Sequence, residues 1–294
     1  MAERVATLIA NPQDRALTPD LAEAACDAVG SRNLYWLADG VACDIPLPES
    51  VENAENLLRH ALGNAPIDVA VQPTGGRRKD LLIADMDSTM IEQECIDELA
   101  AEVGRKAEVA AVTEAAMRGE IDFEDALRER VAVLKGLPVS VIGKVIEERI
   151  TLRAGGRELV ATMRENGAHT MLVSGGFTAF TSVVAERLGF DEHRANELLT
   201  ESGHLTGYVA EPILGQQAKL DALDEAIEEG ALPYSGVLAV GDGANDLAMI
   251  EAAGLGVALH AKPAVAERAD VRIDHGDLTA LLYLQGYRKN DFVD

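Results

Sequence analysis

Three apolar runs of this chain each end in a cluster of polar residues or glycines, and this repeated pattern constrains the fold more than any other feature. The runs are residues 81–84, 171–173 and 237–240, and the clusters that follow them are residues 85–89, 174–176 and 241–246. Continuous apolar runs of this length are typical of strands buried on both faces in a parallel sheet. The carboxyl ends of such strands meet at one edge, where open α/β sheets bind their ligands. We therefore predict an α/β fold with a doubly wound parallel sheet, in which one crevice gathers all three clusters.

The first 72 residues are predicted to form a small module of their own. We expect strands at 5–9, 34–37, 41–45 and 67–71, and helices that begin at the N-caps Thr18 and Ser50 and end near residues 28 and 62. This βαββαβ order is typical of an α+β ferredoxin-like domain and resembles an ACT-type regulatory domain. A structural or dimerising role for the module is as plausible as ligand binding, because fold alone does not set function.

The rest of the chain is predicted to be a linker and one larger domain. Residues 73–79 are rich in turn formers and charge, which is typical of a linker. Residues 80–294 carry the three apolar runs and form the α/β domain. Within it, the stretch from about 92 to 150 has a helical pattern and many charges, so we predict a helical cap inserted after the first strand.

The composition excludes several function classes. The formal net charge of −24 on 294 residues argues against a nucleic-acid surface, because a phosphate backbone requires the opposite sign. No apolar run reaches the length of a membrane span, and the amino terminus lacks a basic-then-apolar signal segment, so we expect no membrane partner and a cytoplasmic protein. The three cysteines, Cys26, Cys43 and Cys95, form no CxxC pair and are expected to be reduced.

The three clusters carry residues suited to phosphoryl transfer. Asp85, Asp87 and Asp242 supply hard oxygen ligands of the kind that Mg²⁺ prefers. Crowded carboxylates repel one another, so a cation or a shared proton is needed to hold them together. Residues 174–176 (Ser-Gly-Gly) offer a hydroxyl and backbone N–H groups where a helix is expected to begin, which is typical of a phosphate cradle. A carboxylate nucleophile, a metal and a phosphate cradle together predict an aspartyl-phosphate intermediate.

The order of these motifs resembles the haloacid-dehalogenase-like phosphatase superfamily. The chain has Asp-x-Asp-x-Thr at 85–89, then Ser-Gly-Gly at 174–176, then a lysine, then Gly-Asp-Gly-x-Asn-Asp at 241–246. Within the superfamily it closely resembles the phosphoserine phosphatase family, through the stretches 85–90, 94–100, 123–131 and 174–177. The resemblance covers roughly residues 80 to 285 and implies a haloacid-dehalogenase-like core with a helical cap. Four ordered motifs with matching flanks are a specific signal.

The resemblance implies a divided set of catalytic roles. Asp85 would be the nucleophile and a Mg²⁺ ligand. Asp87 would protonate the departing serine oxygen, later take a proton from the hydrolytic water, and bind the metal through its backbone carbonyl. Asp242 would complete the protein ligands, and Asp246 would support the waters of the metal. The implied reaction is the Mg²⁺-dependent hydrolysis of O-phospho-L-serine, a small-molecule substrate, as the final step of serine biosynthesis.

The resemblance also implies the residues that bind the substrate. Lys219 and Ser174 would hold the phosphoryl oxygens. Gly175 and Asn245 would complete the phosphate and substrate contacts. In the cap, Glu94 suits an ammonium group and Arg130 can hold a carboxylate with its two-pronged guanidinium. The apolar residues expected to cover the substrate are Met117 and Phe123.

Several alternatives stay open from the sequence. Arg128 competes with Arg130, and by spacing alone Glu94 and Arg130 would be unremarkable surface charges. Another reaction of the superfamily is an alternative, either on a sugar phosphate or as a phosphomutase, and so is transfer of the phosphoryl group to an alcohol other than water. In a different class, the amino-terminal module could make the chain a serine-binding regulatory protein. The same module is the predicted contact of a homodimer.

Overall fold

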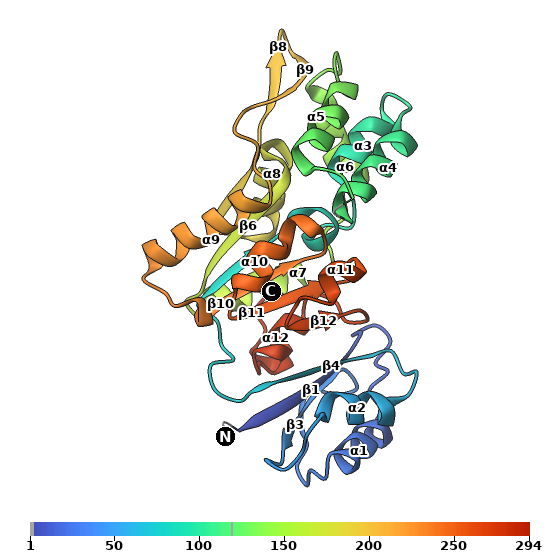
Figure 1. Cartoon of the computed structure of the whole chain (residues 1–294), viewed down its shortest axis with the longest axis vertical. Helices are drawn as coiled ribbons and strands as arrows, with labels where there is room; N and C mark the ends of the chain where they lie inside the picture. Colours follow the sequence, from blue (N-terminus) through green and yellow to red (C-terminus); the bar gives the residue numbers. More distant parts are fainter. Residues whose placement is uncertain (1–2, 119) are drawn as a thin grey trace.

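The structure is a computed structural model that describes residues 3–118 and 120–294, and the side chain of Met117 also lies outside the described part. Figure 1 shows three parts along the long axis of the molecule: a small sheet with two helices at one end, a larger sheet in the middle, and a group of helices at the other end. Among the described residues, none of the helices combines the length and the apolar character needed to cross a membrane.

The amino-terminal module has the predicted βαββαβ order. Its elements are β1 (Arg4–Ala10), α1 (Pro19–Ala28), β2 (Tyr35–Ala38), β3 (Ala42–Leu47), α2 (Ala54–Leu62) and β4 (Ile67–Pro73). The sheet is antiparallel with the order β2-β3-β1-β4, so β2 is an edge strand. Both helices pack on one face of this sheet over a core of its own, which confirms the predicted α+β ferredoxin-like architecture.

One helix start in this module differs from the sequence prediction. Thr18 caps α1 as expected, because its hydroxyl accepts a hydrogen bond from the backbone N–H of Leu21. Ser50 does not cap α2, which begins only at Ala54. The N–H of Val51 bonds back to the carbonyl of Pro48, so Ser50 lies inside a turn instead of at a helix start. Asn53 then enters the helix with a φ of 54°, a left-handed conformation that asparagine tolerates.

The central sheet has six parallel strands in the order β12-β11-β10-β5-β6-β7. They are β5 (Leu81–Ala84), β6 (His169–Phe177), β7 (Glu192–Asn196), β10 (Val237–Gly241), β11 (Leu255–Leu259) and β12 (Val271–Ile273). The helices around them are α7 (Gly156–Glu165), α8 (Thr178–Leu188), α9 (Gln216–Gly230), α10 (Leu247–Ala252), α11 (Pro263–Ala266) and α12 (Ala280–Leu284). Short helical turns cover Met86–Met90 (η1), Tyr234–Gly236 (η2), Ala244–Asp246 (η3) and Lys289–Asp291 (η4).

Strand β5 shows that the sheet is covered on both faces. Leu81 and Ile83 belong to a buried cluster with residues of α9 and α10. Leu82 and Ala84 belong to a second cluster with residues of α7, α8 and α12. Successive side chains of a strand point to opposite faces, so a fully apolar β5 is what a sheet between two helical layers requires. The predicted doubly wound α/β fold is confirmed.

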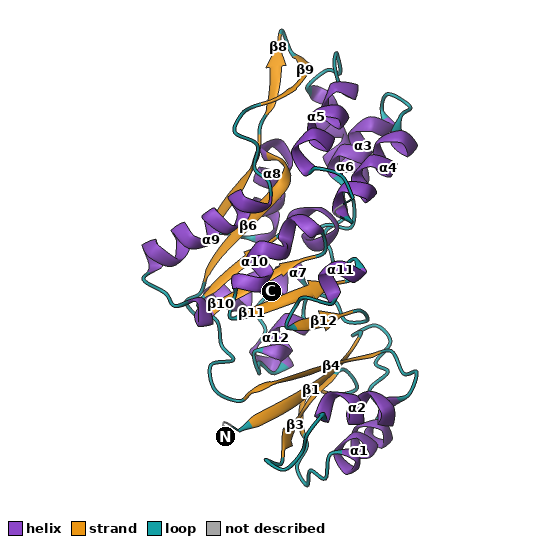
Figure 2. Ribbon diagram, viewed as in Figure 1, coloured by secondary structure: helices purple, strands orange, loops and turns teal. Residues whose placement is uncertain are grey.

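The cap consists of four helices and a hairpin. The helices are α3 (Cys95–Ala101), α4 (Lys106–Met117), α5 (Phe123–Val133) and α6 (Ser140–Arg149), and they stand above the central sheet in Figure 2. The hairpin β8 (Leu198–Glu201) and β9 (His204–Val209) lies beside α5 (Figure 1). Its backbone bonds to the α5–α6 loop: Gly136 N–H donates to Leu205 O and Leu205 N–H donates to Leu137 O, both at 2.8 Å. The sequence predicted the hairpin turn but not this attachment to the cap.

Arg77, between the two sheets, ties the module to the rest of the chain. Its guanidinium bonds to Asp44 of β3, with an Nη1–Oδ2 distance of 2.6 Å, and to the hydroxyl of Thr7 in β1 at 3.0 Å. The same group donates to the carbonyls of Tyr283 and Leu284 in α12, at 3.0 and 2.9 Å. A single side chain therefore holds two strands of the module against the last helix of the central layer.

We expect Arg77→Met to lower the free energy of unfolding by about 3 kcal/mol, because it leaves the Asp44 carboxylate buried without its cation. The two side chains are only 12% and 11% exposed. The matched control is Arg59→Met, which breaks an ion pair to Glu55 whose side chains are 44% and 52% exposed, and should cost under about 0.5 kcal/mol. Urea unfolding followed by circular dichroism measures both. Equal effects of the two substitutions would contradict the assigned role of Arg77.

Candidate active site

The three clusters that follow β5, β6 and β10 converge, as the sequence predicted. One cavity of about 40 Å³ is lined from the central sheet by Asp85, Asp87, Ser174, Gly175 and Asn245, and from the cap by Glu94, Phe123 and Arg130. Asp242, Asp246 and Lys219 are buried beside Asp85. The structure thus brings together every predicted site residue except Met117, which ends α4 and whose side chain is outside the described part.

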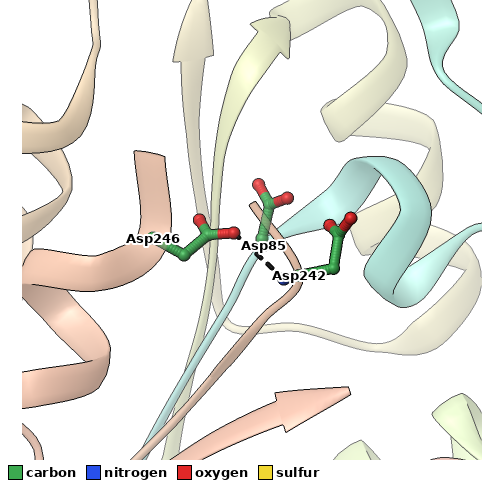
Figure 3. A group of neighbouring side chains, drawn as sticks. All are labelled: Asp85, Asp242 and Asp246. Atoms are coloured by element: carbon green, nitrogen blue, oxygen red, sulfur yellow. Dashed lines mark hydrogen bonds between the residues drawn. The ribbon is translucent and has the colours of Figure 1, made fainter. Parts of the chain in front are cut away.

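Three carboxylates form a compact acidic group at the sheet edge. Asp85 follows β5, Asp242 follows β10, and Asp246 lies at the start of α10; Figure 3 shows how near one another they lie. One oxygen of each lies within 4.8 Å of the others, and all three residues are buried. Carboxylate oxygens at this spacing, with water to complete the shell, fit a hard cation such as Mg²⁺.

Asp246 has both of its oxygens engaged inside the protein. Oδ1 accepts from the Lys219 ammonium at 2.6 Å. Oδ2 accepts from the backbone N–H groups of Asp242 and Gly243, at 3.1 and 3.0 Å. The carboxylate lies so close to the end of β10 that a Cβ at Gly241 would be 2.4 Å from it. Asp246 is therefore placed to hold the 242–243 backbone and Lys219.

Lys219, near the start of α9, is fully buried between two acids. Its ammonium lies 2.5 Å from Asp85 Oδ1 and 2.6 Å from Asp246 Oδ1. Burial alone would lower the pKa of Lys219, but the charges of Asp246 and Asp85 outweigh it and raise the pKa above its ordinary value. The lysine stays protonated and presents a fixed positive charge beside the Asp85 carboxylate.

The acidic side chains of the site carry raised pKa values. Burial raises the pKa of Asp85 to about 7, and the charge of Asp246 adds to the effect while Lys219 opposes it. Burial likewise raises the pKa of Asp87 to about 7, and that of Asp242 well above its usual range. These carboxylates exceed the nearby cations in number, so a divalent cation would lower their pKa values and relieve their repulsion. The donor set therefore fits a metal site.

Asp87 is oriented by contacts from two sides. Its Oδ1 accepts from the backbone N–H of Cys95 at 3.1 Å, at the start of α3. Its Oδ2 lies against Gly176, where a Cβ would be 2.6 Å away, so a larger residue at this position would displace the carboxylate. Residues 174–176 belong to β6 rather than to a helix start, because α8 begins only at Thr178. The sequence prediction placed the start of that helix at residues 174–176, before its observed start at Thr178. The two glycines instead continue the buried strand β6.

The cap places a carboxyl group and a guanidinium in the cavity. Glu94 accepts from the hydroxyl of Ser88 at 2.5 Å, and burial together with the charge of Asp87 raises the pKa of Glu94 to about 8. Arg130 is buried with 5% exposure and donates from Nε to Ala126 O at 3.0 Å. Arg128, the alternative from the sequence, lies on the surface in ion pairs with acidic residues. Arg130 therefore lines the cavity, whereas Arg128 does not.

Phe123 closes the cavity from the cap side. Its ring lies directly on Gly175, where a Cβ would meet the ring at 2.6 Å, and it also borders Gly215. Asn245 lines the same cavity beside it. The ring therefore forms part of the cap-side wall of the cavity.

Asn196 is a site-supporting residue that the sequence reasoning missed. It ends β7, is 3% exposed, and its amide donates to Gly175 O at 2.9 Å. Its carbonyl oxygen accepts from Leu214 N–H at 2.7 Å, just before α9. Asn196 thus joins the Ser-Gly-Gly segment to the helix that carries Lys219. An asparagine at a strand end gives no sequence signal for such a role, because it is also common in solvated turns.

Comparison with known families and proteins agrees with this geometry. Residues 82–251 match the family model described as haloacid dehalogenase-like hydrolase. A phosphoserine phosphatase of Albidiferax ferrireducens is 48% identical over 210 residues, which are 69% of this chain and 88% of that protein. One of Archaeoglobus fulgidus is 45% identical over 226 residues, 76% of this chain. The match spans 65% of that relative's length.

Solved structures extend the likeness to the amino-terminal module. A haloacid dehalogenase family hydrolase from Salmonella enterica superposes with a TM-score of 0.83 at 28% identity, over 97% of this chain and 98% of that one. A phosphoserine phosphatase holding a phospho-aspartyl intermediate analogue superposes with a TM-score of 0.67 at 39% identity, over 70% of this chain and 98% of that one.

Proposed function

Because the chain belongs to the haloacid dehalogenase-like hydrolases, and to their phosphoserine phosphatase group, we propose that it hydrolyses O-phospho-L-serine to L-serine and phosphate. The observation that carries this proposal is one cavity that is lined by the sheet edge on one side and by the cap on the other. The sheet edge offers Asp85, Asp87 and Ser174 for a phosphoryl group. The cap offers Glu94 and Arg130, whose opposite charges complement the ammonium and the carboxylate of an amino acid.

Asp85 is the proposed nucleophile. One oxygen, Oδ1, is held by Lys219, which leaves Oδ2 to attack phosphorus. The P–O bond to serine breaks as the bond to Asp85 forms, and Asp87 donates its proton to the departing serine oxygen. Burial raises the pKa of Asp87, which favours the protonated form that this step requires. Lys219 and the hydroxyl of Ser174 bind the phosphoryl oxygens, and Gly175 and Asn245 complete these contacts.

Water then hydrolyses the aspartyl-phosphate. Asp87, now deprotonated, takes a proton from the water, whose oxygen bonds to phosphorus as the bond to Asp85 breaks. Phosphate leaves and Asp85 is regenerated. The phosphoserine phosphatase with a phospho-aspartyl analogue supports this two-step route by relationship. Phe123 covers the cavity and keeps bulk water out during the first step.

Mg²⁺ is the proposed cofactor. Asp85 and Asp242 would bind it directly, together with the backbone carbonyl of Asp87. Asp246 would support the waters of the metal, and it also accepts a hydrogen bond from the backbone N–H of Asp242. A bound Mg²⁺ supplies charge neutralisation for the approach of an anionic phosphate to Asp85. The preference for Mg²⁺ over softer metals follows from the all-oxygen donor set.

We expect EDTA to abolish phosphate release and added Mg²⁺ to restore it, because the acidic group repels an anionic substrate without a cation.

Asp85→Asn should lower kcat by at least about 10³-fold, since the amide is a poor nucleophile. Asp125→Asn, on the cap surface with a side chain 82% exposed, is the control and should keep wild-type activity. A phosphate-release assay measures all three. Full activity of Asp85→Asn would refute the assignment.

The substrate choice is proposed to depend on the two cap charges. Removing one charge-assisted hydrogen bond to a substrate costs about 1.5–3 kcal/mol. We therefore expect Arg130→Met to lower the ratio of kcat/KM for phosphoserine over phosphoethanolamine by about 10- to 100-fold, because the latter lacks a carboxylate. Glu94→Gln should lower kcat/KM for both substrates, since both carry an ammonium group. Phosphate release from these two compounds and glucose 6-phosphate measures it. Preference of the wild-type protein for glucose 6-phosphate would overturn the proposed substrate.

We further propose that residues 1–72 form a homodimer contact in a cytoplasmic enzyme that completes serine biosynthesis. The supporting observation is the open edge of the small sheet: β4 contacts β12, whereas β2 lies at the other edge and Tyr35 on it is 52% exposed. Sedimentation velocity of the full chain should give a dimer. Tyr35→Pro should shift it to monomer, because proline removes a backbone donor from the edge. A monomeric wild-type chain would refute the contact.

A further inference from the structure

We propose that Thr113 and Asp97 position the guanidinium of Arg130 for the substrate carboxylate, and so take part in setting specificity. The inference rests on the proposed function, in which Arg130 binds that carboxylate. Three cap helices each supply one residue: Asp97 from α3, Thr113 from α4 and Arg130 from α5. All three are buried, with exposures of 8%, 3% and 5%.

The contacts form a directed chain. Nη1 of Arg130 donates to the hydroxyl oxygen of Thr113 at 3.0 Å. The same hydroxyl lies 2.8 Å from Asp97 Oδ1 and 3.1 Å from Val109 O. A hydroxyl has one proton to give, and the shorter contact to a charged acceptor is the stronger one. The proton of Thr113 therefore points to Asp97, and a lone pair of its oxygen faces Arg130.

This chain holds the guanidinium at two points. Nε is fixed by the carbonyl of Ala126 in its own helix, and Nη1 by Thr113 in the neighbouring helix. Two fixed N–H groups determine the plane of a rigid, planar group. Thr113 lines the same cavity as Arg130 and Glu94, so the plane is set within the proposed binding site itself.

The need for such a support follows from the charges in the cavity. Burial lowers the pKa of Arg130 below its ordinary value. The nearby Glu94 opposes this shift, because its carboxylate attracts the guanidinium. Even so, Arg130 and Glu94, both in the described part of the chain, form no ion pair within 4.0 Å. If the two side chains formed an ion pair with each other, neither would be free to bind a zwitterionic ligand. The contacts to Thr113, and through it to Asp97, hold the Arg130 guanidinium away from Glu94 and keep it available to a substrate carboxylate.

The test separates positioning from plain support of the cap fold. Thr113→Val keeps the shape of the side chain and removes the hydroxyl, whereas Thr113→Ser keeps the hydroxyl. The readout is the ratio of kcat/KM for phosphoserine over phosphoethanolamine, which lacks the carboxylate. Thr113→Val should lower this ratio about tenfold, mainly through the KM for phosphoserine, and Thr113→Ser should restore it to within about threefold. Thr181→Val, at another buried threonine in α8, is the matched control and should leave the ratio unchanged.

Each outcome decides the proposal. An equal loss with both substrates would mean a structural role only, and an unchanged ratio would mean no role; either result overturns it. If Thr113→Val does not fold, Asp97→Asn replaces it, since it removes the charge that orients the hydroxyl while keeping an acceptor oxygen. A lowered ratio supports the proposal and an unchanged one overturns it. A wild-type protein that does not prefer phosphoserine would instead refute the proposed function, and its ratio near one identifies that case.

Discussion

The fully buried Lys219 between Asp85 and Asp246 is the interaction on which the rest of the site depends. An ammonium removed from water is tolerated only when opposite charges surround it, and here two carboxylates lie at 2.5 and 2.6 Å. Because Asp85 follows β5, Asp246 follows β10 and Lys219 belongs to α9, this one cation fixes three elements of the central layer. Lys219 also binds Oδ1 of Asp85, which leaves Oδ2 as the oxygen that the proposed reaction uses.

The close approach of these charged groups depends on the absence of side chains around them. A Cβ at Gly241 would strike the Asp246 carboxylate, one at Gly176 would strike that of Asp87, and one at Gly175 would strike the Phe123 ring. These three glycines are therefore required for close contact and not for an unusual backbone conformation, since none of them has a positive φ. They let carboxylates reach the sheet edge, and at Gly175 they let a ring from the cap reach the central layer.

The sequence predicts the central layer well because each apolar run encodes its burial locally. It also contains the signal that separates Arg130 from Arg128: Leu127, Val131 and Leu134 mark the buried face of α5, and Arg130 lies on that face. The contacts of Asn196 and Thr113 could not be predicted, because each depends on which distant segments the fold brings together. The wrong N-cap at Ser50 has a local cause, the turn that Pro48 starts, which outweighs the preference of serine for helix starts.

The arrangement separates the chemistry from the choice of substrate. The proposed nucleophile, the lysine and the acidic group all come from the central layer, whereas Glu94, Arg130 and the chain of contacts behind Arg130 come from the cap. The two sets face each other across one cavity and touch where Phe123 meets Gly175. Changes in the cap can therefore alter which group is bound without moving Asp85 or Lys219. This is why the fold and the sheet-edge motifs indicate phosphoryl transfer, while the structural argument for the substrate depends on Glu94 and Arg130 of the cap.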